Sequence, residues 1–193
     1  MSEIKIVDEY LHPKDHEELQ RMMRAREFPW TVSQKTGEMD INGYGTNPLN
    51  SQMNHWFVDF RFAHFSPFFK YVLPIINQHP VHERVLAISR IKANLELCNE
   101  NHVESEFHYD LFMMYGIKEV PEPNVTNVIY YVNSNNGYTE FETGEKVESV
   151  ANRAVIFSNT LKHRGVSQTD THYRAVINLN LFLGSTTPPF TGG

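Results

Sequence analysis

The feature that most restricts the fold is a series of short β-branched and aromatic runs that begins near Arg84 and continues to about Leu183. Turn residues separate the runs, including the Asn-Gly pair of NSNNGY and the Thr-Gly pair of TGE. Several short strands at close spacing are typical of an all-β sandwich or barrel. Because Asn and Gly tolerate positive φ, residues 133–138 and 143–145 are predicted to form hairpin turns.

The N-terminal part has a different pattern and is predicted to consist of helices and loops. Leu19, Met22 and Met23 recur at helical spacing, so one helix is expected from residue 12 to residue 28. A second amphipathic helix is expected over residues 67–78, with a kink or an early end at Pro74. Residues 184–193 contain few core-forming side chains and are expected to form a mobile tail.

Length and composition favour a single domain spanning residues 1–193. Within it we expect a helical and loop part over residues 1–83 and a β core over residues 84–183. The formal net charge is −6, and no Lys/Arg run forms a basic stripe, which disfavours duplex nucleic acid as a partner.

Cysteine content and hydropathy bear on the compartment. Cys98 is the only cysteine, so an intrachain disulfide and a zinc site built from cysteines are excluded. The N-terminus lacks the apolar core of a signal peptide, and no stretch approaches the apolar length of a membrane span. We therefore expect a soluble, cytoplasmic protein with no membrane partner.

A candidate metal site begins in EFHYDLF, where His108 and Asp110 would share one face of a strand. Such a pair alone is weak evidence, because it is often only a hydrogen-bonded pair. His163, in KHRG, supplies a third ligand type. Two histidines and one carboxylate form the facial triad of non-haem Fe(II) oxygenases, which leaves coordination positions open for a co-substrate and dioxygen.

A candidate anchor for an anionic co-substrate lies in YRAVINLNLF. Strand alternation puts Arg174, Asn178 and Asn180 on one face, whereas the opposite face is wholly apolar. A buried guanidinium requires a buried anion, because an unpaired buried charge is costly. A dicarboxylate co-substrate would supply that anion through a bidentate pair.

Together with VIYYVN, NGYTEF and AVIFSNTLKHRG, this order of residues resembles the prolyl-4-hydroxylase-like branch of the 2-oxoglutarate and Fe(II)-dependent oxygenases. The resemblance covers roughly the segment from Arg84 to Leu183. It implies a mainly β (α+β) fold, a double-stranded β-helix or jelly roll with supporting N-terminal helices.

The resemblance also implies residue roles. His108, Asp110 and His163 would bind Fe(II), and Arg174 would pair with the distal carboxylate of 2-oxoglutarate. Tyr131 matches a position whose hydroxyl often shares that carboxylate. Thr139 falls where many members have a residue that packs against the co-substrate chain.

The implied activity is a dioxygenase that couples oxidative decarboxylation of 2-oxoglutarate to hydroxylation, with O2 as the other co-substrate and ascorbate as a supporting reductant. Peptidyl proline or another peptide side chain is the leading substrate, and a small molecule is the alternative. Asn178 and Asn180 are predicted to line the substrate pocket. Asn180 stands where the family pattern has an aromatic, which leaves the substrate class open. The covering lid is predicted to draw on Trp30, Tyr44, Trp56 and Phe57.

Two other classes of protein fit parts of the pattern. A jelly-roll binding protein with an inert metal would not need the Arg174 anchor. A cupin-like hydrolase or isomerase would use the same ligands to activate a metal-bound water. Outside the candidate site, we interpret Glu104 and Glu106 as solvated charges and Arg164 as the partner of a surface carboxylate.

Overall fold

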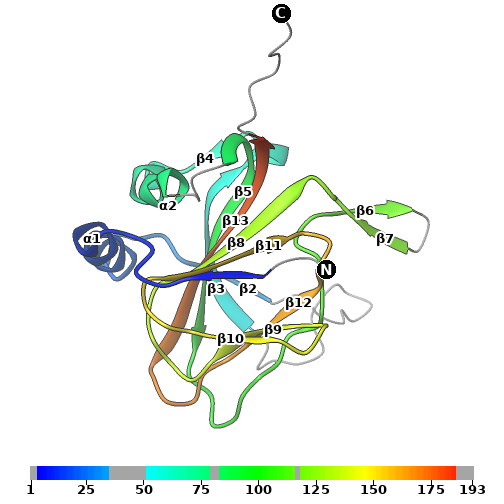
Figure 1. Ribbon diagram of the computed structural model, residues 1–193. Helices are drawn as coiled ribbons and strands as arrows, with labels where there is room; N and C mark the ends of the chain where they lie inside the picture. Colours follow the sequence, from blue (N-terminus) through cyan, green and yellow to red (C-terminus); the bar gives the residue numbers. More distant parts are fainter. Residues whose placement is uncertain (1–3, 35–50, 79–82, 116–117, 186–193) are drawn as a thin grey trace, which may run out of the picture.

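A computed structural model describes residues 4–34, 51–78, 83–115 and 118–185, which form two antiparallel sheets (Figure 1). The larger sheet has the order β1, β11, β8, β13, β5, β3, β2, with β4 paired to β3. Its strands are β1 (Lys5–Val7), β11 (Arg153–Ser158), β8 (Val125–Tyr131), β13 (Tyr173–Ser185), β5 (Glu83–Leu97), β3 (Ser51–Asp59), β2 (Thr31–Gln34) and β4 (His64–Phe65).

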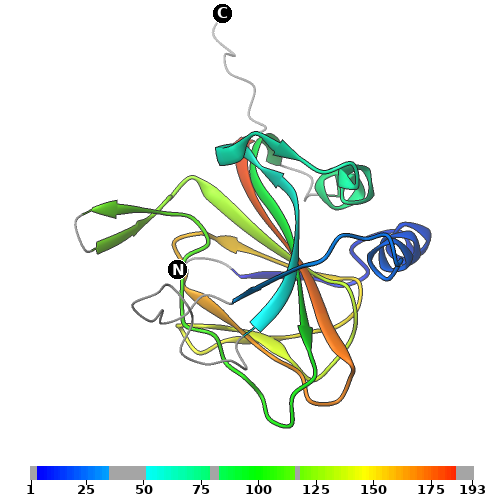
Figure 2. The same cartoon turned by 180° about the vertical axis from the view of Figure 1, so that it is seen from behind.

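The smaller sheet has the order β10, β9, β12, and a separate hairpin joins β6 to β7. The hairpin stands out from the body of the molecule in both Figure 1 and Figure 2. The strands of these two units are β10 (Lys146–Glu148), β9 (Tyr138–Phe141), β12 (His163–Val166), β6 (Phe112–Tyr115) and β7 (Lys118–Pro121).

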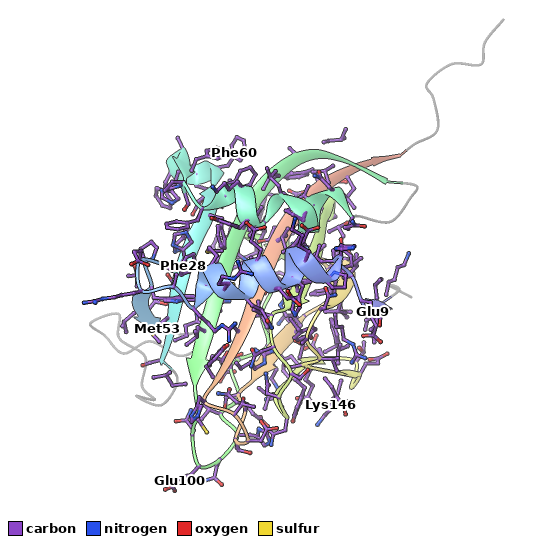
Figure 3. The ribbon with its side chains drawn as sticks, turned by 90° about the vertical axis from the view of Figure 1, so that its left-hand side faces the viewer. Glu9, Phe28, Met53, Phe60, Glu100 and Lys146 are labelled. Carbon is purple, nitrogen blue, oxygen red and sulfur yellow. The ribbon has the colours of Figure 1, made fainter. Side chains whose placement is uncertain are left out.

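The helices cover the outer face of the larger sheet, and Figure 3 shows α1 (Pro13–Met23) lying across it. Leu19 of α1 packs into one buried cluster with Tyr130, Ile177 and Leu179 of the sheet. A second cluster lies between the two sheets, where Tyr131 of β8 meets Phe141 of β9. The predicted apolar face of β13 therefore points to the helices, and its polar face points to the space between the sheets.

Helix α1 ends at Met23, five residues before the end that the sequence predicted. The chain leaves the helix through turns in which Ala25 N–H donates to the Met22 carbonyl and Phe28 N–H to the Ala25 carbonyl. This departure buries Phe28, whose ring lies 4.5 Å from the ring of His55 and 5.2 Å from that of Phe68. Burial of a large aromatic ring outweighs the continuation of a surface helix.

The helix predicted over residues 67–78 is divided in two. A 3-10 turn, η2 (Phe69–Tyr71), precedes α2 (Leu73–Asn77), and Pro74 stands in the first turn of α2. Proline has no N–H to donate, so it fits the start of a helix and interrupts one that runs through it. A further 3-10 turn, η1 (Phe60–Phe62), follows β3.

Three other expectations differ from the structure. The N-terminal part contributes strands β1 to β4, where β3 pairs with β5, β2 and β4 pair with β3, and β1 pairs with β11. Residues 133–138 do not form a hairpin turn, since β8 and β9 belong to different sheets and the segment crosses between them. EFHYDLF is not a regular strand, and His108 pairs with His163 through an isolated bridge.

Two sequence predictions are confirmed. The turn over residues 143–145 joins the paired strands β9 and β10, with Gly144 at a φ of 99°. The mainly β, two-sheet architecture with N-terminal helices is also as expected. The first two residues of the predicted tail, Gly184 and Ser185, instead belong to strand β13, which pairs with β5. The rest of the predicted tail, from residue 186 onward, lies outside the described residues, as does Tyr44 of the predicted lid. Within the described part of the chain, no helix combines the length and the apolar character that crossing a membrane requires.

Candidate active site

The structure brings His108, Asp110 and His163 together. One candidate ligand atom from each residue lies within 4.8 Å of the other two. Two backbone hydrogen bonds join the segments, from His108 N–H to the His163 carbonyl at 3.0 Å and back at 3.2 Å. This pairing holds the two imidazole ring centroids 4.8 Å apart.

Each histidine is arranged so that it can act as a neutral nitrogen ligand. His108 Nδ1 lies 2.8 Å from the Glu106 carbonyl, and a proton donated there leaves Nε2 with a free lone pair. That Nε2 atom lies 3.9 Å from Asp110 Oδ1. Burial lowers the pKa of His163 to about 4, so its imidazole is neutral at physiological pH.

Asp110 is fixed by a network that the sequence did not reveal. Its Oδ1 atom lies 2.7 Å from Arg90 Nη2, and its Oδ2 atom accepts a hydrogen bond of 3.0 Å from the Asn180 amide. Arg90 Nε in turn donates to Asn180 Oδ1 at 2.6 Å. Burial alone would raise the pKa of Asp110, but Arg90, the two histidines and the Asn180 bond hold it well below its usual range. The carboxylate is therefore ionised and cannot rotate freely.

These three residues fit a divalent transition metal. Two imidazoles and one carboxylate on one side of an ion are the donor set of the non-haem Fe(II) triad. The backbone of Leu161 lies close enough to His163 to raise its pKa as a hydrogen-bond partner, against the larger effect of burial. A histidine that donates one ring N–H to a backbone carbonyl keeps its other nitrogen available as a ligand.

The triad opens into a cavity of about 250 Å³ between the sheets. Arg174, Thr139 and Asn178, all predicted from the sequence, line the same cavity. Asn180 was predicted to line it as well, but it is fully buried and instead supports Asp110. Strand β5 contributes four further polar side chains to the cavity wall, which the sequence analysis did not predict. They are Arg90, Lys92, Asn94 and Glu96.

Arg174 is held rigidly at one part of the cavity wall. Its Nε donates to Ser149 Oγ at 2.9 Å, and its Nη1 lies 3.6 Å from Glu96 Oε1. Its guanidinium also lies over the ring of Tyr131, 5.8 Å from the centroid. The sequence led us to expect a bound co-substrate as the only anion for this arginine, whereas Glu96 of the same chain supplies one.

Gly137 explains how the arginine reaches this position. A Cβ atom at residue 137 would lie 2.8 Å from Arg174 Cδ and 2.8 Å from the Val166 carbonyl oxygen. Such contacts are too short for any side chain, so the segment between β8 and β9 requires a glycine here. The Asn-Gly pair that suggested a hairpin turn therefore serves a close approach of backbone to side chain.

Tyr131 and Thr139 lie next to the anchor. The Tyr131 hydroxyl donates to Thr139 Oγ1 at 2.7 Å, and Arg174 Nη2 approaches the same oxygen at 3.4 Å. Tyr131 is fully buried and is not among the residues that line the cavity. Thr139 thus stands between the tyrosine and the cavity, and Tyr131 acts on the cavity through it.

The predicted lid is not assembled as expected. Phe57 is fully buried in the cluster between the helices and the larger sheet. The Trp30 indole donates to the Met23 carbonyl at 3.1 Å and packs against Phe28. Trp56 lies under Lys92, with the ammonium 5.1 Å from its ring centroid. Outside the cavity, Arg164 pairs with Glu104 and Glu140, as predicted for a surface arginine.

Comparison with solved structures identifies the class of fold. The chain has the fold of prolyl hydroxylases and other 2OG-Fe(II) oxygenases, so the predicted double-stranded β-helix is confirmed. No family model matches the sequence, and no curated protein matches it. The sequence identities to the solved structures are low, so the likeness establishes the fold.

Three of these structures illustrate the range. A prolyl hydroxylase from Trichoplax adhaerens, in complex with a hypoxia inducible factor oxygen degradation domain peptide fragment, has a TM-score of 0.58 at 14% identity, over 93% of this chain and 83% of that one. A viral collagen prolyl hydroxylase from Paramecium Bursaria Chlorella virus-1, as a 2OG complex, has a TM-score of 0.55 at 10% identity, over 92% and 94%. The alpha ketoglutarate dependent epimerase from nogalamycin biosynthesis has a TM-score of 0.59 at 10% identity, over 94% and 78%.

Proposed function

We propose that this protein is a 2-oxoglutarate- and Fe(II)-dependent dioxygenase that hydroxylates a second substrate. The observation that carries the proposal is the convergence of His108, Asp110 and His163 on one point of a cavity that also contains the buried Arg174. The fold shared with 2OG-Fe(II) oxygenases supports the same assignment. When bound, iron and 2-oxoglutarate supply the activation of O2 that couples decarboxylation of the 2-oxo acid to oxidation of the second substrate.

The residues of the chain supply binding and orientation. His108, Asp110 and His163 would hold the metal, with Asp110 kept in one rotamer by Arg90 and Asn180. Arg174 would bind the distal carboxylate of 2-oxoglutarate, and Thr139 would contact it as well. Because Ser149 and Glu96 already orient the guanidinium, little side-chain entropy is lost when the co-substrate binds.

A hydrolase or isomerase that uses the same ligands is supported less well. A metal-bound water would need the triad alone, and Arg174 would then serve only as the partner of Glu96. An inert jelly-roll binding protein would likewise need no arginine in this position. Arg174 is only 3% exposed and faces the same cavity as the triad, which favours a co-substrate with a carboxylate.

The test is an anaerobic titration of the purified protein with Fe(II) and then with 2-oxoglutarate. We expect the weak visible charge-transfer band of an iron and 2-oxo acid chelate, and succinate formation once O2 is admitted. Asp110→Ala and Asp110→Asn should lose the band, because the anionic ligand is gone. Asp8→Ala serves as a matched control, since Asp8 is a surface carboxylate that is paired with Arg153.

Folding of each variant is checked by circular dichroism and thermal unfolding, because Asp110→Ala leaves Arg90 without its partner. Normal iron affinity in a folded Asp110→Asn variant would show that the metal assignment is wrong. Turnover under anaerobic conditions without 2-oxoglutarate would favour the hydrolase or isomerase instead.

A further inference from the structure

The cations in the cavity wall differ in how their charges are balanced. Four cationic side chains line the cavity. Three of them form ion pairs with carboxylates of the same chain, so their charges are compensated before any ligand binds. These pairs are Arg61 with Asp59 at 3.0 Å, Arg90 with Asp110 at 2.7 Å and Arg174 with Glu96 at 3.6 Å.

Lys92 is the exception. No ion pair joins its ammonium to a carboxylate among the described residues. The ammonium lies over the Trp56 ring, 5.1 Å from the ring centroid. Burial and the repulsion of neighbouring Arg90 lower the pKa of Lys92 to about 8, although attraction to Asp110 opposes the shift. Attraction to the more distant Asp110 therefore offsets only part of the cost of burial. The remaining cost lowers stability unless a ligand uses the charge.

The excess charge persists after the cofactor and co-substrate of the proposed function are added. Fe(II) brings two positive charges and 2-oxoglutarate two negative ones, so together they leave the charge of the cavity unchanged. One positive charge, that of Lys92, still lacks a counterpart among the described residues that line the cavity. A second substrate with a single negative charge would balance it.

Two acceptors lie beside Lys92 on the cavity floor. Asn178 of β13 stands directly opposite Lys92 of β5 in the antiparallel register, and Asn94 is two residues further along β5. Both asparagines line the cavity, and the side-chain oxygen of each is buried without a hydrogen-bond partner in the described part of the chain. Unpaired buried acceptors favour a ligand that carries N–H or O–H donors.

We propose that Lys92 binds the carboxylate of a small prime substrate whose adjacent N–H or O–H groups donate to Asn94 and Asn178. The inference rests on the proposed oxygenase function and specifies its substrate class as amino or hydroxy acids. A phosphate monoester carries about 1.5 to 2 negative charges at neutral pH and would overcompensate one lysine. A proline inside a peptide carries no carboxylate of its own and would leave Lys92 unpaired.

The experiment compares matched carboxylates and carboxamides. The probes are the common L-amino acids, L-lactate and glycolate, each beside its own amide, and a proline peptide with acetylated and amidated ends. Succinate formation above the rate without prime substrate is measured with Fe(II) and 2-oxoglutarate. Independently, the shift of the unfolding midpoint is measured on the metal-free protein, so that carboxylate binding is observed without turnover.

Lys92→Met is the test variant, Lys92→Arg is the conservative variant, and Lys70→Met is the matched control. Lys70 also lies over an aromatic ring, 4.9 Å from the centroid of Tyr71, but outside this cavity. We expect at least one acid to be preferred over its amide by about tenfold or more, as for a charge-assisted bond. That preference should disappear in Lys92→Met, and it should remain in Lys92→Arg and in Lys70→Met.

Three results would overturn the inference. The first is that no acid in the panel is preferred over its amide. The second is coupled turnover of the blocked proline peptide that is equal in the parent and in Lys92→Met. The third is that Lys92→Met weakens 2-oxoglutarate as strongly as Arg174→Ala, which would assign Lys92 to the co-substrate. Absence of the visible chelate band in the parent refutes the oxygenase function instead, and the midpoint shifts of the metal-free protein still test Lys92.

Discussion

Arg174 and Lys92 line one cavity, but the protein surrounds the two positive charges differently. Arg174 is almost fully buried and is surrounded by Glu96, Ser149 and Thr139, which fix its guanidinium. Lys92 is half-buried, lies over the Trp56 ring and has no carboxylate partner among the described residues. A cation that is held and compensated is a preorganised anchor, whereas an uncompensated cation lowers stability until a ligand arrives.

The difference suits two separate roles, which are binding of the co-substrate by Arg174 and recognition of the second substrate by Lys92. An anchor for a co-substrate must present the same geometry in every turnover, and a network of hydrogen bonds achieves this. A site that recognises the second substrate gains selectivity when its charge is unsatisfied without the correct ligand, because a neutral analogue then leaves the cation unpaired. The following changes test whether the two cations have these separate roles.

The largest effect is expected from Arg174→Ala. Loss of one partner of a buried, charge-assisted pair costs about 2 to 5 kcal/mol, so affinity for 2-oxoglutarate should fall by roughly 30-fold to several thousand-fold. Iron affinity should be unchanged, because Arg174 contacts none of the three candidate ligands. The measurement is the anaerobic titration of the chelate band, and unchanged 2-oxoglutarate affinity would contradict the anchor.

A double variant tests whether Arg174→Ala loses 2-oxoglutarate only because the unpaired, buried Glu96 destabilises the fold. Arg174→Met with Glu96→Gln removes both charges together, so that neither is left buried alone. Arg174→Lys keeps the charge but loses the bidentate fork, and it should recover only part of the affinity. The ranking of the parent, the lysine variant and the alanine variant therefore separates charge from geometry.

The sequence predicted Arg174 but not Lys92, and the reason lies in the two strands. Both β13 and β5 alternate polar and apolar residues, and both present their polar face to the cavity. Arg174 is the only charged residue of β13, where the other polar side chains of its face are uncharged, and this makes it conspicuous. On β5 the charged residues in SRIKANLEL resemble the solvated face of an edge strand. That face is enclosed because the smaller sheet, through Thr139, His163 and Gly165, lines the same cavity from the other side.

The convergence of His108, Asp110 and His163 could be predicted because two of these residues are close in sequence and the third begins a recognisable strand. The support for Asp110 could not, since Arg90 and Asn180 come from two strands whose partnership depends on the register. The same limit explains the error over residues 133–138. An Asn-Gly pair indicates a tight approach of the backbone, but it does not reveal that the neighbour is Arg174 instead of a paired strand.

The second prediction concerns stability. Below pH 8 Lys92 is protonated in both the folded and the unfolded protein, and the cost of its buried charge is fully present. Lys92→Met should therefore raise the free energy of unfolding at pH 7 by about 1 to 3 kcal/mol, given about 1.4 kcal/mol for each unit of pKa difference and a discount for partial exposure. The measurement is urea denaturation of the metal-free protein.

The stability difference between the parent and Lys92→Met is expected to depend on pH. The folded pKa of Lys92 is about 8 and its ordinary value is 10.5. Between these values the unfolded chain binds more protons, so the stability of the parent rises with pH and the advantage of Lys92→Met shrinks. Lys70→Met provides the baseline for the removal of a surface lysine. A variant that is less stable than the parent at pH 7 would mean that the Lys92 ammonium is compensated after all.

The smallest effect is expected from Tyr131→Phe, and its neighbour Tyr130→Phe is the matched control on the opposite face of β8. The Tyr131 hydroxyl donates to Thr139 beside Arg174, whereas the Tyr130 hydroxyl bonds to His16 and Asn152 on the helix side. Loss of one hydrogen bond is worth about 1 kcal/mol, so Tyr131→Phe should weaken 2-oxoglutarate about fivefold through a less well oriented Thr139. Tyr130→Phe should lower the free energy of unfolding by a similar amount and leave co-substrate affinity unchanged. Equal 2-oxoglutarate affinity in both variants would mean that Arg174 and Thr139 form the anchor without help from the strand behind them.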